Sequence, residues 1–219
     1  LLSQRISHRS ATDIITKKAL DWFKQDRDPA QPFFFMLHYK APHDPWQNAY
    51  RYDDYLAEVE IPEQDNLMDS GSGRSPAIEQ STQEIAGRSH HTQFTPEFKA
   101  MPASPEKRHL VYQDYMKRYL RCVKGIDDNL GRVFDYLDES GLAENTIVIY
   151  TADQGFFLGE HGLYDKRFMY EEALRVPLMV RWPGQVEPGS VCDELVLNLD
   201  YPETILDLAG RDVPADMQG

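Results

Sequence analysis

Two adjacent oxygen-bearing side chains follow an apolar run in the middle of the sequence. Asp153 and Gln154 follow residues 145–151 after a single alanine, Ala152, and Gly155 comes next. Carboxylate and amide oxygens are hard ligands, which suit Ca²⁺ or Mg²⁺ better than zinc. A calcium ion needs more than two ligands, so others would have to come from elsewhere. An ordinary turn after a strand explains the same residues, and both interpretations remain open from this segment alone.

Two cationic or protonatable residues could act on an anion. Lys166 lies in a charged loop downstream of Gly155, where its ammonium could donate to an anionic oxygen, although a solvated surface lysine is the commoner case. His43 lies in a loop between Pro42 and the Asp44–Pro45 turn. Its imidazole could donate a hydrogen bond to an anion or act as a general acid, or it could simply cap the turn.

Asp44 is an unfavourable neighbour for an anion site. Its carboxylate directly follows His43 in the sequence. Since like charges repel, we expect this side chain to point away from a bound anion or to bind a hydroxyl group of the substrate.

Alternating strands and helices are predicted around these residues. Hydrophobic periodicity predicts helices over residues 12–25, 106–139 and 200–208, and buried strands over residues 32–39, 145–151 and 177–182. Residues 47–105 lack periodicity and are predicted to form a long irregular excursion. The order indicates an α/β fold with a mostly parallel sheet. Ligands of such sheets gather beyond the carboxyl ends of the strands, where both His43 and Asp153 would lie.

Composition excludes some classes of function. The chain of 219 residues has 23 basic and 36 acidic residues, a net charge of −13, which argues against a general nucleic-acid surface. No apolar run approaches the roughly 20 residues that span a bilayer. Cys122 and Cys192 lack metal-finger spacing. The opening LLSQRISHRS lacks a signal-peptide pattern, and we expect both ends to be cuts through a longer protein.

The segment TADQGFFLGEHGLYDKRFMYEEALRVPLMVRWPG closely resembles the second metal-binding segment of the type I sulfatases, which belong to the alkaline phosphatase-like superfamily. FFFMLHYKAPHDPW resembles the histidine loop of the same family, and GIDDNLGRVFDYLDESGLAENTIVIYTADQG resembles the connection between the two. The resemblance covers nearly the whole chain. It implies that residues 1–219 are part of a sulfatase catalytic domain: an α/β domain with a mostly parallel sheet flanked by helices, incomplete at both ends.

This resemblance implies hydrolysis of sulfate esters. The family uses a formylglycine made from the Cys or Ser of a Cys/Ser-x-Pro-x-Arg motif. Carried over by position, Asp153 and Gln154 would be ligands of a divalent metal, usually Ca²⁺. Lys166 would contact the sulfate group, and His43 would lie beside the sulfate and the leaving oxygen. His161 of the Gly-Glu-His-Gly string would also contact the substrate.

Three features of the family have no counterpart in this sequence: the formylglycine motif, an early Asp-Asp ligand pair and a Lys-x-His element. We therefore expect residue 1 to follow the missing segments, and the chain alone to be inactive. The expected substrate is a sulfated small molecule or glycan, in the periplasm, outside the cell or in a lysosome. The alternatives are a phosphodiesterase or phosphonate hydrolase of the same superfamily, and a non-catalytic relative that binds an anion and a metal.

Overall fold

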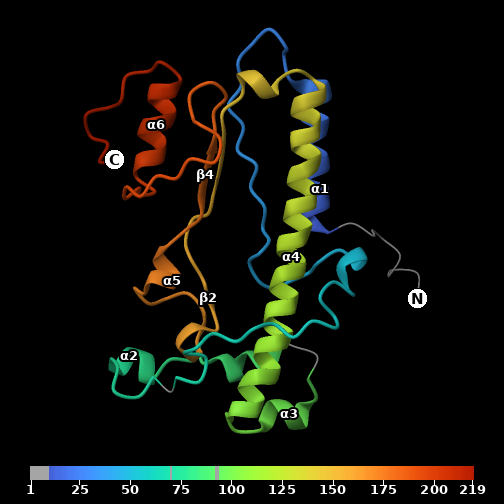
Figure 1. The fold of residues 1–219 in the computed structure, drawn as a ribbon, viewed down its shortest axis with the longest axis vertical. Helices are drawn as coiled ribbons and strands as arrows, with labels where there is room; N and C mark the ends of the chain where they lie inside the picture. Colours follow the sequence, from blue (N-terminus) through green and yellow to red (C-terminus); the bar gives the residue numbers. More distant parts are fainter. Residues whose placement is uncertain (1–9, 70, 92–93) are drawn as a thin grey trace. The chain divides into compact units, whose positions relative to one another are not determined.

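The computed structural model describes residues 10–69, 71–91 and 94–219, which form two compact units (Figure 1). The first unit extends to Glu144 and takes in Phe156–Leu174. The second comprises Asn145–Gly155 and Arg175–Gly219. Among the described residues, no helix is long and apolar enough to cross a membrane.

The long helix α4 (Pro105–Glu139) supports the first unit, as the periodicity predicted. The Ser104 side chain accepts a hydrogen bond from the Lys107 amide at 3.1 Å and so caps the first turn. Gly141, with φ of +70°, follows the last turn in the left-handed conformation that glycine favours. One face of the helix is buried, and it includes Val111, Tyr112, Tyr115, Cys122, Ile126, Val133 and Leu137.

Helix α1 (Ala11–Asp21) packs along α4 and continues into a π-helical turn, η2 (Trp22–Asp26) (Figure 1). Ser10 and Asp13 cap its N-terminus reciprocally, since each side chain accepts from the other residue's amide. The Asp13 carboxylate also accepts from Arg51 at 2.5 and 2.8 Å and from Asn129 of α4 at 2.9 Å. One buried carboxylate thus joins α1, α4 and the segment after the histidine loop.

The predicted buried strand over residues 32–39 is absent from the described structure. The segment has no strand pairing, and exposure alternates along it. Phe33 and Phe35 pack on the aromatic rings of Trp22 and Phe23, whereas the side chains at the next positions are exposed. A strand requires a hydrogen-bonded neighbour. No described segment provides one here. Residues 32–39 therefore show the alternating exposure of a strand but form no sheet.

The predicted irregular excursion consists of loops and short helices that pack on α4. These helices are η3 (Tyr50–Tyr52), α2 (Pro76–Glu79), η4 (Ile85–His91) and α3 (Pro96–Ala100). Ile61, Leu67 and Ile85 are buried in the same hydrophobic cluster as Val111 and Tyr112 of α4. The excursion is therefore part of the core, which its composition did not indicate.

A short hairpin carries the charged loop that the sequence singled out. Strands β2 (Phe157–Leu158) and β3 (Tyr164–Asp165) pair antiparallel around the 3₁₀ turn η6 (Glu160–Gly162), and α5 (Glu171–Leu174) follows. Phe157, Leu163 and Ala173 form a small core there. Tyr115 of α4 donates a hydrogen bond to the Phe157 carbonyl at 2.7 Å. The hairpin is thereby fixed to the long helix.

In the second unit, strands β1 (Val148–Thr151) and β4 (Leu178–Arg181) pair antiparallel, with Val148 opposite Arg181 and Thr151 opposite Leu178. The sequence predicted both strands, but as buried members of a parallel sheet. The pairing is antiparallel and β4 is exposed throughout. A continuous apolar run indicates a strand without specifying its partner. η5 (Ala143–Asn145) precedes β1, and the predicted last helix is present as α6 (Asp200–Leu208).

Asp13 makes the free energy of unfolding depend on pH in the acidic range. Its bonds to Arg51 hold the pKa of the Asp13 carboxyl well below its usual range. Its contribution to the free energy of unfolding is therefore complete above about pH 4, the unfolded-state pKa, and is lost as the pH falls toward the folded-state pKa. We expect Asp13→Asn to lower the free energy of unfolding by about 2 kcal/mol at pH 7. The difference from wild type should shrink below pH 4.

Urea denaturation of the full-length protein at pH 7 and pH 3 measures this difference. Asp127→Asn is the matched control, because Asp127 is an exposed carboxylate on α4 that pairs with Lys124 at 3.2 Å. The control should change the free energy of unfolding by less than about 0.5 kcal/mol. Equal effects of the two substitutions would contradict the role given to Asp13.

Gly162 allows the turn η6 to approach the backbone of the excursion closely. Its φ is +69°, and a Cβ there would lie 2.7 Å from the Asp69 carbonyl oxygen and 3.1 Å from that of Leu67. Gly162→Ala should therefore cost about 2 kcal/mol or more, since neither backbone can yield cheaply. Gly131→Ala, in the middle of α4 with nothing within 4 Å of the added Cβ, should instead stabilise by about 1 kcal/mol. Thermal melts of both variants test the contrast.

Candidate functional site

The histidine loop is held by hydrogen bonds within itself and by α4. The His43 amide donates to the Lys40 carbonyl at 3.0 Å, and the Lys40 ammonium donates to the Asp44 carbonyl at 2.5 Å. The indole of Trp46 donates to the Pro42 carbonyl at 2.6 Å. Trp46 is buried, and its ring packs edge-on against Tyr115 at 4.8 Å. The loop backbone is thus fixed, while the His43 side chain stays exposed.

The Asp44 carboxylate contacts both His43 and Arg88. Its Oδ1 lies 3.0 Å from Nδ1 of His43, and its Oδ2 accepts from the Arg88 guanidinium at 3.0 Å. The sequence left open whether this carboxylate would repel an anion beside His43. The ion pair with Arg88 offsets its charge and fixes its direction.

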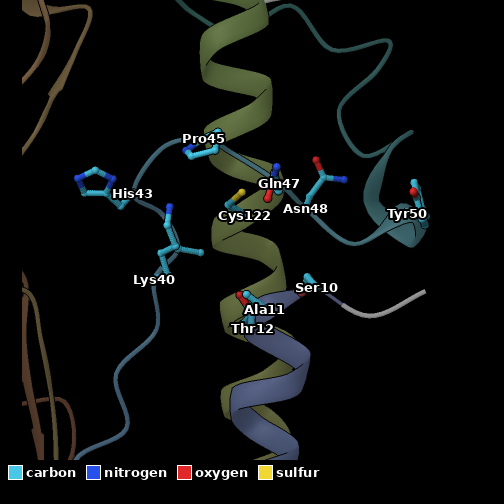
Figure 2. A pocket seen from close by; sticks show the side chains of 11 residues that line it. Ser10, Ala11, Thr12, Lys40, His43, Pro45, Gln47, Asn48, Tyr50 and Cys122 are labelled. Carbon is cyan, nitrogen blue, oxygen red and sulfur yellow. The ribbon is translucent and has the colours of Figure 1, made fainter. Parts of the chain in front are cut away.

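A cavity of about 210 Å³ adjoins the histidine loop (Figure 2). It is lined on one side by Lys40 and His43 and elsewhere by Gln47, Asn48 and Tyr50, together with the start of α1. Cys122 of α4 also lines it, and burial raises the pKa of this thiol to about 11. The thiol is therefore neutral at physiological pH, which suits a packing role on α4.

Lys166 follows β3 and presents its ammonium over the ring of Phe156, at 5.8 Å from the ring centroid. Gln83 accounts for its backbone position, because the Gln83 amide group donates to the Lys166 carbonyl at 2.7 Å. Among the residues in the described ranges, the Lys166 ammonium has no hydrogen-bond acceptor and no ion pair. Because the Lys166 backbone is fixed and its ammonium has no hydrogen-bond acceptor in the described structure, this residue is suited to bind an external anion.

His161 lies in a dense polar cluster. Its Nε2 is 3.3 Å from the Glu172 carboxylate, and its Nδ1 is 3.2 Å from the Asn66 amide group and 3.3 Å from the Arg74 guanidinium. The Tyr170 ring packs against it at 4.9 Å. All these contacts are within the protein, and they explain the position of the His161 ring without a ligand. Its predicted role in substrate binding stays a prediction.

Asp153 and Gln154 lie just beyond the end of strand β1 in the second unit. The Asp153 carbonyl accepts from the Asn198 side chain at 2.9 Å, and the Thr151 hydroxyl bonds the Tyr201 hydroxyl of α6 at 3.0 Å. The backbone at the strand end is therefore held. Within the described part of the chain, neither the Asp153 carboxylate nor the Gln154 amide group has a partner. No cluster of three or more metal-binding side chains occurs among the described residues.

The donor set fits a hard divalent cation but does not complete its coordination. Asp153 supplies a carboxylate and Gln154 supplies an amide oxygen, and both are uncommitted. Ca²⁺ takes six to eight oxygen ligands. Most of the ligands would have to come from other residues or from water.

Two residues that the sequence did not single out connect the candidate groups of the first unit. Arg88 pairs with Asp44 beside His43, and Gln83 holds the carbonyl of Lys166. Both come from the excursion, at or just before η4, where no periodicity or motif marks them. Only their burial and their contacts reveal them.

Comparison with known proteins places these residues in a family context. The family model described as Sulfatase matches residues 3–211. An N-acetylglucosamine-6-O-sulfatase of Bacteroides thetaiotaomicron is 36% identical over 249 residues, covering 95% of this chain and 44% of that protein.

Solved structures agree with the sequence comparison. A protein solved in complex with its substrate D-glucosamine-2-N,6-O-disulfate has a TM-score of 0.85 and 35% identity, over 95% of this chain and 50% of that one. A phosphonate monoester hydrolase from Silicibacter pomeroyi has a TM-score of 0.75 and 26% identity, over 96% of this chain and 40% of that one. The chain therefore spans about half the length, or less, of each of these relatives, and the α/β class of the alkaline phosphatase-like fold is confirmed. The chain belongs to the sulfatase family.

Proposed function

We propose that the full-length protein containing this chain hydrolyses a sulfate ester on a sulfated glucosamine, as a small molecule or within a glycan. The observation that carries the proposal is the continuous similarity, over 95% of the chain, to a named N-acetylglucosamine-6-O-sulfatase and to a structure with a disulfated glucosamine bound. The substrate class is taken from those relatives. The candidate groups of this chain would supply part of the chemistry that the reaction needs.

His43 and Lys166 act on the anionic ester in this proposal. The Lys166 ammonium has no acceptor in the described structure and is free to bind a sulfate oxygen. His43 presents an exposed imidazole whose Nδ1 is already bonded to Asp44, so its Nε2 is the ring nitrogen left for a proton on the leaving oxygen. Together they stabilise negative charge as it develops on the oxygens of the ester. His161 is assigned only a neighbouring position, since its polar atoms contact the protein.

Asp153 and Gln154 would hold a divalent cation, which we propose to be Ca²⁺. When bound, the cation supplies positive charge that stabilises an anionic oxygen. The formylglycine motif that the family resemblance implies has no counterpart in this sequence. We also propose a periplasmic, secreted or lysosomal location, following the same resemblance.

A second candidate is hydrolysis of a phosphonate or phosphate ester. The similarity to a phosphonate monoester hydrolase, with a TM-score of 0.75, supports it. The groups of this chain would serve either anion, because sulfate and phosphonate esters both present anionic oxygens to a lysine and a metal. Substrate choice is therefore a matter for direct measurement.

Sulfate release from N-acetylglucosamine-6-sulfate by the full-length protein tests the proposal. We expect turnover of this substrate, with a kcat/KM at least about tenfold above that for a phosphonate monoester. Lys166→Ala should lower kcat/KM about 100-fold or more, because it removes a cation from a developing charge. Faster cleavage of the phosphonate would favour the second candidate instead.

Arg167→Ala is the matched control for Lys166. Arg167 is the adjacent cation, it is largely exposed, and it pairs with Asp165 at 3.6 Å. We expect its kcat/KM to stay within about threefold of wild type. If both substitutions reduced activity equally, the loss would come from the local net charge and not from a specific contact of Lys166.

Calcium binding tests the role of Asp153. Asp153→Ala should weaken calcium binding, measured by titration calorimetry on protein stripped with a chelator, by about tenfold or more. It should also abolish the rise in melting temperature that calcium produces in the wild type. Asp193→Ala, an exposed carboxylate of the same unit, should leave both quantities unchanged. Unaltered calcium affinity in Asp153→Ala would contradict the ligand assignment.

A further inference from the structure

A buried arginine stands behind the histidine loop. Arg88 of η4 is only 4% exposed, and among the described residues Asp44 is its one ion-pair partner. Its guanidinium lies over the rings of Trp46, at 4.4 Å, and Tyr164, at 5.1 Å. Its Nε atom is buried with no partner in the described part of the chain. A buried guanidinium with an unsatisfied donor is costly, so stability alone is a weak reason for its presence.

The contacts form a continuous chain from Arg88 to His43. Arg88 binds Oδ2 of Asp44, and Oδ1 of the same carboxylate lies 3.0 Å from Nδ1 of His43. The Asp44 carbonyl oxygen is also 3.0 Å from Nδ1. Both oxygens can only accept, so Nδ1 must carry a proton. The hydrogen bond to the carbonyl already favours this tautomer of the imidazole. The carboxylate beside it, which pairs with Arg88, favours the same proton on Nδ1.

We propose that Arg88 is a positioning residue for His43, acting through Asp44. The proposal deepens the proposed sulfatase function, on which it rests. Arg88 holds Asp44 with one oxygen toward Nδ1 of His43, so that Nε2 faces the substrate side with a fixed ring orientation. Without the guanidinium, the Asp44 side chain, which is 36% exposed, loses the ion pair on Oδ2 that directs Oδ1 toward Nδ1 of His43.

The same segment also reaches the hairpin that carries Lys166. Tyr164, whose ring covers Arg88, donates its amide hydrogen to the Gln83 carbonyl at 3.0 Å, and the Gln83 side chain binds the Lys166 carbonyl. Residues 83–88 therefore contact both the histidine loop and the hairpin before Lys166. Displacing Arg88 should affect the orientation of His43 first, since the contacts to Lys166 pass through Gln83 and do not involve the guanidinium.

The test uses Arg88→Met and Asp44→Asn in the full-length protein, with Arg118→Met as the matched control. Methionine fills much of the volume of the arginine and keeps contact with the two rings. Asp44→Asn is the second variant, because its amide oxygen can still accept a hydrogen bond from Arg88 while the negative charge beside His43 is removed. Arg118 pairs with Asp114 at 2.8 Å on α4, and no contact in the described structure links it to the histidine loop.

We expect Arg88→Met and Asp44→Asn each to lower kcat for the sulfate ester by about tenfold. Removal of a general acid itself lowers kcat by about 100-fold or more, so the expected loss is smaller. KM should stay within about twofold of wild type, because the interaction with the leaving oxygen develops only in the transition state. The kcat of the double variant should lie within about twofold of the kcat of the slower single variant. Both changes break the same chain of contacts, so their effects should not add. Arg118→Met should retain the wild-type kcat.

The ¹⁵N resonances of the His43 ring separate this proposal from the proposed function. In protein labelled at histidine, the wild type should show a proton held on Nδ1, and Arg88→Met should shift the Nδ1 resonance toward the average of the two tautomers. This signature does not depend on which ester is cleaved, so it survives failure of the sulfatase proposal. A folded Arg88→Met protein with an unchanged kcat and unchanged His43 resonances would overturn the positioning role, as would fully additive losses in the double variant.

Discussion

One fully buried tyrosine on α4 joins the two loops that carry the candidate groups of the first unit. The ring of Tyr115 packs on Trp46, whose indole holds the histidine loop, and its hydroxyl donates to the Phe157 carbonyl at the start of the hairpin. Burial raises the pKa of Tyr115 well above its usual value, so the hydroxyl remains a donor at any physiological pH. Because α4 is a single uninterrupted helix, segments distant in the sequence are held against one rigid support.

The buried charges show why the irregular excursion must be ordered. The segment from Gln47 to Pro105 has little regular secondary structure, yet it supplies Arg51 to the buried carboxylate of Asp13 and Arg88 to Asp44. Each of these charges is paired within the first unit, and breaking such a pair leaves an uncompensated charge. The excursion therefore constrains α1, α4 and the histidine loop simultaneously. Loop closure over so long a segment costs little more than over a short one, and these specific pairs offset that cost.

The sequence predicted what depends on local pattern and missed what depends on partners. The helices at residues 12–25, 106–139 and 200–208 are present, because helical periodicity and capping residues are local. Residues 32–39 show the alternation of a strand without a sheet, and β4 pairs antiparallel, because pairing depends on neighbours that one segment cannot specify. Asp153, Gln154, Lys166 and His43 were singled out as candidates by their type, their spacing and the family resemblance, and their roles stay predictions. Arg88 and Gln83 were not singled out, since their importance arises only from long-range contacts.

The structure distinguishes charged groups that stabilise the fold from those available to a ligand. Asp13 accepts from Arg51, Asn129 and a helix amide, and Lys107 is buried with its ammonium donating to the carbonyls of Lys99 and Met101. Within the described ranges, Asp153 and Lys166 have no such partners for their charged ends, although their backbones are held by Asn198 and Gln83. An ordered backbone that presents an unpaired charge contributes little to stability, because solvent already satisfies the charge. The same arrangement lowers the ordering cost of binding an ion or an ester, which is the physical reason for proposing these two residues as ligand-binding groups.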